Sequence, residues 1–460
     1  MTTMFQNLAD QVSRLSPLGI QGRVRKVVGL SITVEHLPVA VGSLCTIRGR
    51  ATGRPVRCEV VGFHGDETLL MALDEMDGVS HGDPVHLTVR RQTCGVGDEL
   101  LGRVLNGLGE PIDDKGPIRC GSRRPIEARA IGALQRQTIQ DPIGTGIRAI
   151  DSCLTCGRGQ RVGIFSGAGV GKSVLLGMMA RYTSAHVNVI CLVGERGREV
   201  REFIERDLGP EGLRRSVVIV STNDEPPLLK IKAALAAHAV AEHFRDTGRD
   251  VLLMLDSVTR LAAAQRQVGL SAGEPPTTKG YPPSVFSMLP RILERAGRGP
   301  TGSITGFYTI LVEGDDLNEP VADAVRSILD GHLVLSRRLA NLGHYPAIDL
   351  TQSISRLMTE LVDQEHLKLA RTVVRLLAAY DEVADLVNIG AYATGANPDV
   401  DLAVAMHREI LAFLRQSITE PVSLDQAHKQ LADLSARIER TRKQVETQGK
   451  QRPAAAAAGT

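Results

Sequence analysis

Residues Ser166-Gly167-Ala168-Gly169-Val170-Gly171-Lys172-Ser173 lie between a short apolar run at 161–165 and a helical pattern that begins at Val174. A strand, a glycine-rich turn, Lys-Ser and a helix, in this order, make a phosphate-binding loop. Glycines let successive backbone N–H groups point at phosphate oxygens, and the helix N-terminus adds partial positive charge. Lys172 then reaches the β- and γ-phosphates, and the Ser173 hydroxyl holds Mg²⁺. The pattern predicts nucleotide binding by Gly167, Ala168, Gly169, Val170, Gly171, Lys172, Ser173 and Val174.

The strict form of this motif has glycine at position 166, where this chain has serine. A glycine-rich turn that binds no ligand is the plain alternative. A dinucleotide-binding loop is excluded, because it needs glycine where Lys172 stands. Gly171-Lys172-Ser173 between a strand and a helix favours the nucleotide.

Size and composition indicate a soluble globular protein of two to four domains. The chain has 460 residues, 43% of them hydrophobic, and a net charge of +2. This charge argues against nucleic-acid binding through bulk electrostatics, and the absence of tryptophan argues against base-stacking platforms. No apolar run reaches the ~18 residues of a spanning helix, and the polar N-terminus does not resemble a signal peptide. We therefore expect the chain to stay in the cytosol.

The first 18 residues predict an amphipathic helix. Its apolar positions recur at spacings of three and four, and they are Phe5, Leu8, Val12 and Leu15. Pro17 and Gly19 end the pattern. The stripe packs either on its own chain or on a partner, and both interpretations stay open.

The rest of the chain divides into a β-barrel, an α/β unit and a helical unit. Residues 19–93 are short β-branched runs separated by glycine and proline, typical of a small barrel; their one aromatic, Phe63, speaks against nucleic-acid binding there. Residues 94–365 alternate apolar strands with helical patterns, which predicts a mainly parallel sheet. The expected strands are 162–165, 187–193, 217–221, 251–255, 307–312 and 332–336.

Residues 366–445 are expected to be helical, and 446–460, which end in an alanine run, to be a disordered tail. An apolar stripe recurs there at heptad-like spacing, through Leu424, Ala427, Leu431, Leu434, Ile438 and Val445. It is either the core of a helical hairpin or a short coiled-coil contact with a partner.

Two further strands end in residues suited to phosphate chemistry. Strand 187–193 leads into Gly194-Glu195-Arg196, where Glu195 can deprotonate an attacking water and Arg196 can contact the terminal phosphate. Strand 251–255 leads into Asp256, which either holds Mg²⁺ or caps the next helix. A solvated helix start is the alternative for the arginines and glutamates at 198–205, which form ordinary i,i+4 pairs. Together the three strand ends favour phosphoryl transfer.

Cys153-Leu154-Thr155-Cys156 is the one close cysteine pair. It is suited to redox chemistry or half a zinc site, but no second pair and no histidine pair at ligand spacing accompanies it. We interpret it as two reduced thiols.

With these motifs in place, the chain resembles the ATPases of type III secretion, which are relatives of the catalytic subunits of rotary ATP synthases. The resemblance spans about 20 to 440 and is carried by Gly194-Glu195-Arg196-Gly197-Arg198-Glu199, Gly273-Glu274-Pro275-Pro276, Lys279-Gly280-Tyr281-Pro282-Pro283-Ser284-Val285-Phe286, Leu311-Val312-Glu313-Gly314-Asp315-Asp316, His344-Tyr345-Pro346-Ala347-Ile348-Asp349 and Ser353-Ile354-Ser355-Arg356. Serine at 166 is usual in this family. The run at 165–181 is closer to the flagellar branch than to the injectisome branch. Gly306 stands where the resemblance leads us to expect alanine.

The resemblance implies a RecA-like core in a homohexameric ring that hydrolyses ATP with Mg²⁺. It implies that Tyr345 stacks on adenine and that Arg356 reaches into the neighbouring subunit as an arginine finger. It also implies partners: a dimeric stator-like regulator at residues 1–18, a central coiled-coil stalk protein, a membrane protein of the export gate, and export chaperones with their substrates. The expected location is the cytoplasmic face of a membrane export apparatus.

The resulting hypothesis is an ATPase that energises flagellar type III protein export. An injectisome ATPase is the first alternative. A hexameric RNA translocase lacks support because the barrel has no aromatic platform. A ring subunit that only binds nucleotide is disfavoured by Glu195 together with Lys172.

Overall fold

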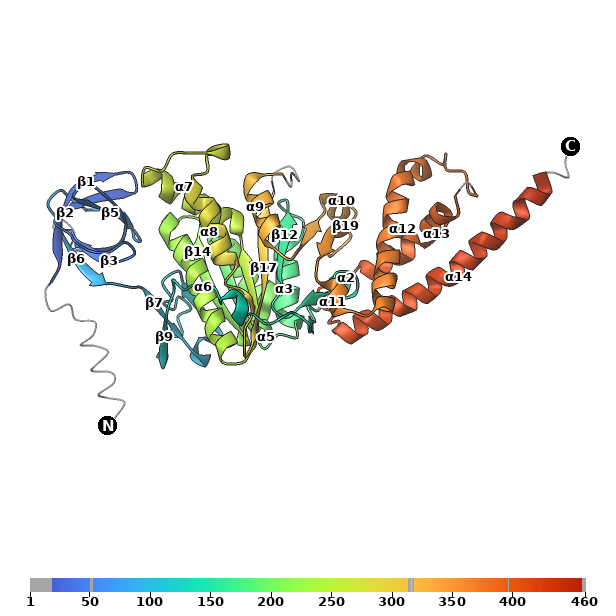
Figure 1. Cartoon of the computed structure of the whole chain (residues 1–460), viewed down its shortest axis with the longest axis horizontal. Coiled ribbons are helices and arrows are strands. Elements are labelled where there is room, and N and C mark those ends of the chain that lie inside the picture. Colours follow the sequence, from blue (N-terminus) through green and yellow to red (C-terminus); the bar gives the residue numbers. More distant parts are fainter. Residues whose placement is uncertain (1–18, 50–52, 313–315, 317, 396, 457–460) are drawn as a thin grey trace.

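The computed structural model describes residues 19–49, 53–312, 316, 318–395 and 397–456. Figure 1 shows an elongated molecule with a β-barrel at one end, an α/β unit in the middle and a helical unit at the other end. This confirms the three-part fold expected from the sequence. The amphipathic helix expected at residues 1–18 lies outside the described residues. No helix within the described ranges is long and apolar enough to cross a membrane.

The barrel is closed, with the strand order β1-β2-β5-β4-β3-β6. Buried and exposed positions alternate along its strands, so that residues such as Ile32, Val34 and Cys45 fill the interior. The six strands are β1 Gln21–Val28, β2 Ser31–Glu35, β3 Leu44–Arg48, β4 Pro55–His64, β5 Glu67–Ala72 and β6 Pro84–Val89.

The central sheet has nine strands, eight of them in the order β19-β18-β12-β17-β15-β13-β14-β8, with β16 pairing with β17. All pairs from β18 to β8 are parallel, and the edge strand β19 runs antiparallel to β18. The bounds are β8 Arg103–Asn106, β12 Arg161–Ser166, β13 Val187–Glu195, β14 Ser216–Thr222, β15 Asp250–Asp256, β16 Gly297–Arg298, β17 Ser303–Leu311, β18 Gly331–Leu335 and β19 Ile348–Ser355. All six expected strands are confirmed.

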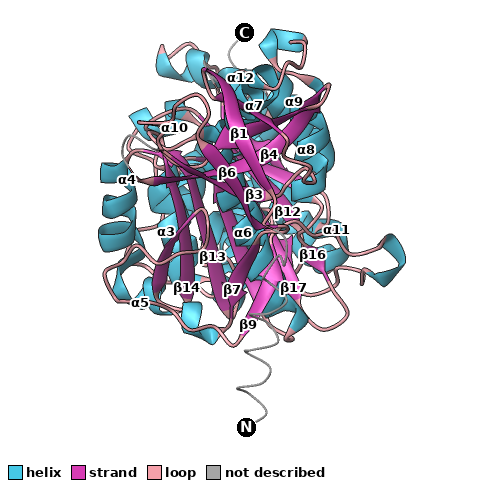
Figure 2. Ribbon diagram, turned by 90° about the vertical axis from the view of Figure 1, so that its left-hand side faces the viewer, coloured by secondary structure: helices cyan, strands magenta, loops and turns pink. Residues whose placement is uncertain are grey.

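Helices cover both faces of this sheet, which is why its strands are almost uninterruptedly apolar. Along β13, Val189 and Cys191 pack on one side, whereas Ile190 and Leu192 pack on the other. In Figure 2 the helices α3 and α8 lie on opposite sides of the strands. The covering helices are α2 Arg148–Cys153, α3 Lys172–Tyr182, α6 Pro227–Asp246, α7 Val258–Ser271, α8 Pro283–Leu293 and α9 Pro320–Ile328. Shorter elements are β7 Thr93–Val96, β9 Ser122–Pro125, β10 Pro142–Ile143, β11 Cys156–Gly157, α4 Gly197–Glu202, α5 Gly209–Arg214, α10 Arg337–Asn341 and α11 Met358–Leu361.

Three long helices make the C-terminal unit: α12 Gln364–Asn388, α13 Pro398–Leu414 and α14 Leu424–Ala456. The heptad-like stripe of α14 faces inward, because Ala427, Leu431, Leu434 and Ile438 are at most 1% exposed. It packs on α13, α12 and α2 of the same chain. From Leu431 to Ile438 the stripe is therefore core of this chain, and Val445 is only partly covered.

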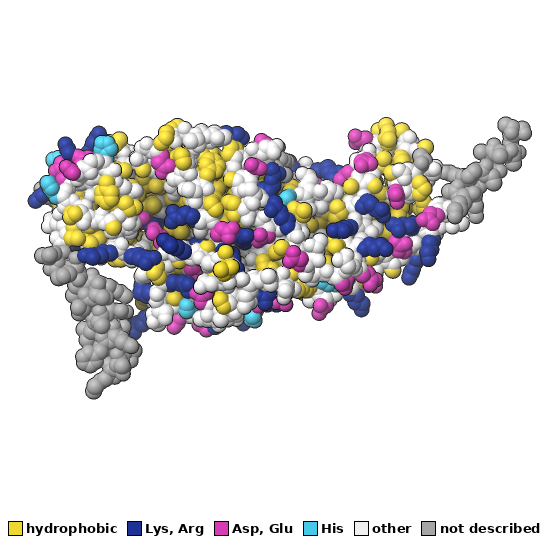
Figure 3. All heavy atoms as spheres, viewed as in Figure 1, with side chains coloured by type: hydrophobic (Ala, Val, Ile, Leu, Met, Phe, Trp, Pro, Cys, Tyr) yellow, Lys and Arg dark blue, Asp and Glu magenta, His cyan; other side chains and the backbone are white. Residues whose placement is uncertain are grey.

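The start of the expected disordered tail differs from the prediction, since residues 446–456 lie within α14. Glutamine, lysine, arginine and above all alanine favour helix, and an existing helix extends at little cost, whereas Gly449 and Pro453 oppose it. Residues 457–460 lie outside the described residues. On the surface drawn in Figure 3, basic and acidic side chains are interspersed, in keeping with the small net charge.

A buried ion pair joins the barrel to the central unit. Lys232 of α6 has its Nζ atom 2.6 Å from Oε2 of Glu59 on β4 and 3.3 Å from Oε1 of Glu127. Burial raises the pKa of Glu59 above its ordinary value, and Lys232 opposes that shift. Removing Lys232 alone would leave the buried Glu59 without its partner, which is expected to destabilise this junction.

Gly306, where the resemblance led us to expect alanine, has a local explanation in β17. A Cβ atom at this position would lie 2.6 to 2.9 Å from the ring of Tyr308, closer than packing allows. The Tyr308 ring is fully buried and its hydroxyl lies 3.4 Å from Nε2 of His238. Glycine at 306 thus makes room for a tyrosine two residues further along the same strand.

We predict that Gly306→Ala destabilises the central unit by about 1–3 kcal/mol, because overpacking forces the ring or the backbone to shift. The midpoint of urea unfolding, followed by circular dichroism, measures the change. Gly62→Ala on β4 is the matched control, since nothing lies within 4 Å of the added atom. Equal midpoints for the two variants would contradict the proposed contact.

Candidate active site

Parallel strands bring the three predicted strand ends to one edge of the sheet. The loop after β12 carries Lys172, β13 ends at Glu195 and β15 ends at Asp256. The Lys172 ammonium contacts Oδ1 of Asp256 and lies 3.5 Å from Oε1 of Glu195. All three side chains are largely buried, so the charges compensate one another in a region of restricted water.

The loop between β12 and α3 has the backbone that a phosphate site needs. Gly169 and Gly171 adopt φ values of 77° and 89°, in the left-handed region that favours glycine. Helix α3 starts at Lys172, so its N-terminus faces the loop. Ala168 and Gly169 are exposed while Val170 is buried, and this arrangement anchors the loop and leaves its tip open to a ligand.

Glu195 is held between two cations. Besides Lys172, Nη1 of Arg260 lies 2.7 Å from Glu195 Oε2 and also donates to the carbonyl of Gly194. Arg260 comes from the first turn of α7, and nothing in the local sequence pointed to it. These two ion pairs fix the orientation of the Glu195 carboxylate, a group that can accept a proton from water.

Asp256 does not cap the helix that follows it. Ser257 is the N-cap of α7, and its hydroxyl accepts a hydrogen bond from the Arg260 N–H at 3.3 Å. Asp256 instead accepts a hydrogen bond of 2.7 Å from the Thr309 hydroxyl on the adjacent strand β17. This excludes the capping alternative. The Asp256 carboxylate therefore lies beside the phosphate loop as an oxygen donor for a cation. Thr309 is a second contributor that sequence reasoning missed.

Arg196 and the residues after it lie at the rim of the site. Arg196 is the N-cap residue of α4, with its exposed guanidinium 3.3 Å from Oε1 of Glu199. Further along, the expected i,i+4 pairs Arg198–Glu202 and Arg201–Glu205 form at 2.7 and 2.8 Å.

Tyr345 lies beside the phosphate loop although 174 residues separate it from Gly171. A Cβ atom on Gly171 would be 3.2 Å from Cε1 of the Tyr345 ring, and that ring is 45% exposed. The Tyr345 carbonyl accepts a hydrogen bond of 3.0 Å from the N–H of Gln416, just after α13. An exposed aromatic face next to a phosphate loop is suited to stacking on a base.

Arg356 lies at the other end of the sheet. Because β19 is antiparallel, its last residue, Ser355, pairs with Gly331 at the amino end of β18. Four residues of strand, about 13 Å at 3.3 Å per residue, separate Gly331 from the carboxyl end of β18 at Leu335. The structure therefore keeps Arg356 apart from the phosphate loop of its own chain.

The donor set fits Mg²⁺ held together with a nucleotide. Ser173 is exposed at the start of α3, and Asp256 supplies a carboxylate, both of them hard oxygen donors. Within the described residues no group of three or more His, Cys, Asp or Glu side chains forms a metal cage. Such a site suits a cation that takes its remaining ligands from phosphates and water. At the start of the loop the Ser166 hydroxyl is buried without a partner among the described residues.

The cysteine pair has no sign of reactivity. Cys153 and Cys156 are free and buried. Burial raises the pKa of Cys153 to about 11 and that of Cys156 further, so neither thiol ionises near neutral pH.

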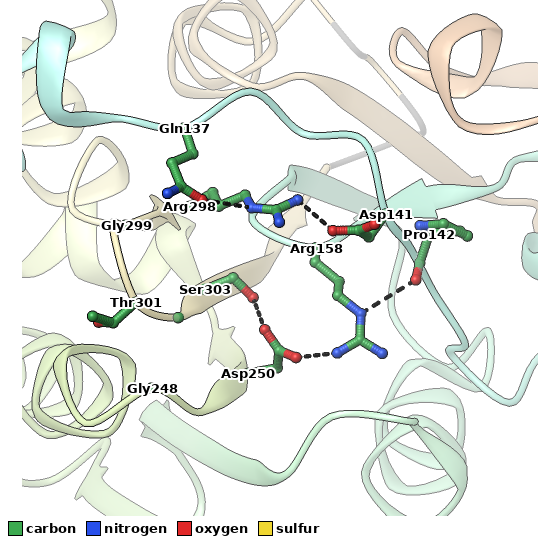
Figure 4. A pocket seen from close by; sticks show the side chains of 11 residues that line it. Gln137, Asp141, Pro142, Arg158, Gly248, Asp250, Arg298, Gly299, Thr301 and Ser303 are labelled. Carbon is green, nitrogen blue, oxygen red and sulfur yellow. Dashed lines mark hydrogen bonds and ion pairs between the residues drawn. The ribbon is translucent and has the colours of Figure 1, made fainter.

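A cavity of about 440 Å³ lies at the amino ends of the strands, away from the predicted site. In Figure 4 its charged side chains neutralise one another, Arg158 with Asp250 and Arg298 with Asp141. None of the predicted site residues lines it. The phosphate loop, not this cavity, is the candidate active site.

Each of the three parts of the chain matches a known protein family. Residues 146–355 match the nucleotide-binding domain of the ATP synthase alpha/beta family, 24–88 match its beta-barrel domain, and 362–433 match the T3SS EscN ATPase C-terminal domain. The flagellum-specific ATP synthase of Bacillus subtilis (strain 168) is 47% identical over 94% of this chain and 99% of its own. A type 3 secretion system ATPase of Xanthomonas euvesicatoria is 50% identical over 86% of this chain and 89% of its own.

A solved structure of the assembled ATPase EscN from the type III secretion system of enteropathogenic E. coli is also similar. It superposes with a TM-score of 0.85 at 43% identity and covers 90% of this chain and 99% of that one.

His344, the residue before Tyr345, is expected to make the stability of the protein depend on pH. His344 is 1% exposed and its Nδ1 accepts a hydrogen bond of 3.3 Å from Arg415 Nε. Burial, and then the charge of Arg415, lower the pKa of His344 to about 4. Between pH 6.5 and 4 the unfolded chain binds a proton here that the folded chain does not, so stability falls as pH falls.

We expect this group to account for about 1–3 kcal/mol of the stability lost between pH 7 and 4. Urea unfolding at both pH values gives the loss for the wild type and for His344→Asn, which cannot titrate there. The loss should be smaller in His344→Asn by that amount. An unchanged loss would mean that the His344 proton is not linked to folding.

Proposed function

Because this chain belongs to the ATP synthase alpha/beta family and is an ATPase of its type III secretion branch, we propose that it drives flagellar protein export as a homohexameric ring. The energy source is hydrolysis of Mg-ATP at the edge of the central sheet. One observation carries the proposal: the contact of Lys172 with Asp256, with Glu195 beside them.

In this proposal Lys172 changes partner when ATP binds. Without ATP the two carboxylates offset the charge of its ammonium; with ATP bound the ammonium leaves Asp256 and offsets the negative charge of the β- and γ-phosphates. Asp256, freed from the ammonium and still held by Thr309, then faces the cation together with Ser173. Mg²⁺ held there would neutralise phosphate charge.

Glu195 is the proposed general base. It accepts a proton from the attacking water while Arg260 keeps its carboxylate oriented. The backbone N–H groups of the loop and the N-terminus of α3 hold the phosphates, and Tyr345 stacks on the base. Arg196 contacts the terminal phosphate from the rim, and Arg356 of one subunit completes the site of the next.

The flagellar assignment is the finer part of the proposal, because relatives of both kinds are equally similar in identity. Flagellum-specific ATP synthases are 44–50% identical, and type 3 secretion system ATPases are 44–50% identical. Flagellar relatives align over 88–94% of this chain and those of secretion systems over 86–90%, so the two ranges overlap. The run at 165–181 supports the flagellar system, and an injectisome is the second candidate.

The proposed partners follow the same reasoning. EscN has been solved in complex with its central stalk EscO, and this supports a coiled-coil stalk protein for the present ring. A stator-like regulator dimer at residues 1–18, a membrane protein of the export gate, and export chaperones with their substrates complete the proposed set. Together they would hold the ring at the cytoplasmic face of the export apparatus. Restored motility in a strain lacking its flagellar ATPase tests the assignment, and rescue of injectisome secretion alone would contradict it.

We predict that Glu195→Gln lowers the turnover of ATP by about 10²–10⁴, because the amide cannot accept a proton. Mg-ATP binding should persist, since Lys172 and the loop remain. Phosphate release measures turnover and a fluorescent ATP analogue measures binding. Lys172→Ala is the contrasting variant, in which binding itself should weaken. Glu195→Gln with turnover within about threefold of the wild type would remove Glu195 from this role.

We predict that Arg356→Ala lowers the turnover by about 10³–10⁵ and that mixing it with Glu195→Gln restores part of the activity. A mixed ring contains interfaces that pair an intact Glu195 with an intact Arg356 of the neighbouring subunit. Phosphate release by verified mixed hexamers is the measurement. No recovery in such hexamers would contradict action between subunits.

A further inference from the structure

The amino end of β12 contains a fully buried polar side chain that the proposed chemistry does not use. Gln160 directly precedes β12 and is 0% exposed. Its Oε1 accepts a hydrogen bond of 2.8 Å from the N–H of Gly157. Its Nε2 donates to the Asp330 carbonyl at 3.2 Å and to the Ser355 hydroxyl at 3.1 Å. The amide thus joins the start of β12 to the residue that precedes Arg356.

The next residue, Arg161, makes a two-pronged contact with Asp330. Nε and Nη2 of Arg161 donate to Oδ2 and Oδ1 of Asp330, each at 3.0 Å, and the Arg161 N–H donates to Oδ2 at 3.0 Å. In return the Asp330 N–H donates to the Arg161 carbonyl at 2.9 Å. A bidentate, mostly buried contact of this kind sets a geometry that a single hydrogen bond cannot.

Asp330 in turn holds the backbone of Arg356. Its carbonyl accepts a hydrogen bond of 3.0 Å from the Arg356 N–H. Within the part of the chain that the structure describes, the Arg356 guanidinium makes a single, long hydrogen bond of 3.4 Å, to the Arg326 carbonyl. The Arg356 backbone is therefore held directly by Asp330, which Arg161 holds in turn, and Gln160 holds the preceding side chain, that of Ser355. The Arg356 side chain is exposed.

We propose that Gln160, Arg161 and Asp330 form a positioning clamp that aims Arg356 at the active site of the neighbouring subunit. This rests on the proposed role of Arg356. None of the three clamp residues touches ATP in this proposal. Gln160 acts through the Ser355 hydroxyl, and Arg161 and Asp330 act through the backbone N–H of Arg356. Since β12 continues from the clamp into the phosphate loop, one short strand joins the site a subunit contains to the residue it supplies to the next.

The test compares Asp330→Asn with a matched control at the same end of the sheet. Asp330→Asn turns an acceptor toward Arg161 into a donor and breaks the fork. Asp250→Asn removes the neighbouring ion pair with Arg158, which Figure 4 shows. Neither residue of this ion pair belongs to the pairings of β18 or β19. We expect the kcat of Asp330→Asn to fall about 10–100-fold with the KM for ATP within about twofold, because a displacement of about 1 Å costs this much. Asp250→Asn should keep the wild-type kcat.

Mixed hexamers separate positioning from a merely structural role. A subunit carrying Asp330→Asn keeps its own phosphate loop and Glu195, so mixing it with Glu195→Gln should restore activity, as for Arg356→Ala. Loss of activity without such recovery, while Arg356→Ala does recover, would show that Asp330 only supports the fold and would overturn the clamp. Wild-type kcat in Asp330→Asn beside an inactive Arg356→Ala would overturn it too.

The role of Arg356 itself is checked in the same series. Full activity of Arg356→Ala would refute the proposed finger, a result distinct from failure of the clamp. Arg161→Lys repeats the test if Asp330→Asn does not fold, because lysine keeps the charge but cannot make the two-pronged contact. Its kcat should fall in the same range, and a wild-type kcat would again overturn the clamp.

Discussion

The Lys172 ammonium lies against two carboxylates from different strands, and the rest of the site is arranged around that contact. Asp256 and Glu195 come from β15 and β13, which are not neighbours of β12 in the sheet order. They meet because parallel strands present their carboxyl ends at one edge. The sheet can maintain this order because helices bury both of its faces. This contact can rearrange when a nucleotide binds. An incoming phosphate competes with the two carboxylates for the Lys172 ammonium and so frees Asp256.

A second constraint is the opposite orientation of β19. The chain carries the phosphate loop at one edge of the sheet and Arg356 at the other, so a complete site on this account needs two copies. Strand β12 connects the two edges. Its carboxyl end leads into the phosphate loop, and the buried contacts at its amino end hold Asp330 beside Arg356. The barrel and the C-terminal helices flank this unit, and the latter also contact Tyr345 through Gln416.

The sequence alone predicted those parts of the site that are set locally. The phosphate loop follows from spacing, and Glu195 and Asp256 follow from their positions after apolar strands. Arg260 and Thr309 could not be found this way, because an arginine in a helix and a threonine inside a strand are common and only the tertiary fold brings them to the acids. Tyr345 and Arg356 were named from resemblance, not from spacing. Residues 446–456 are helical and not the expected tail, because a low-complexity segment can continue a helix that packing has already formed.

A structure of the assembled ring with Mg-ADP and a planar phosphate mimic would test the central claim most directly. We predict that Lys172 Nζ contacts the mimic and no longer Asp256, that Asp256 and Ser173 face the Mg²⁺, and that Glu195 lies one water away from the mimic. Arg356 of the adjacent subunit should reach the same group. A nucleotide bound elsewhere, or Lys172 still paired with Asp256 beside a bound mimic, would contradict the account.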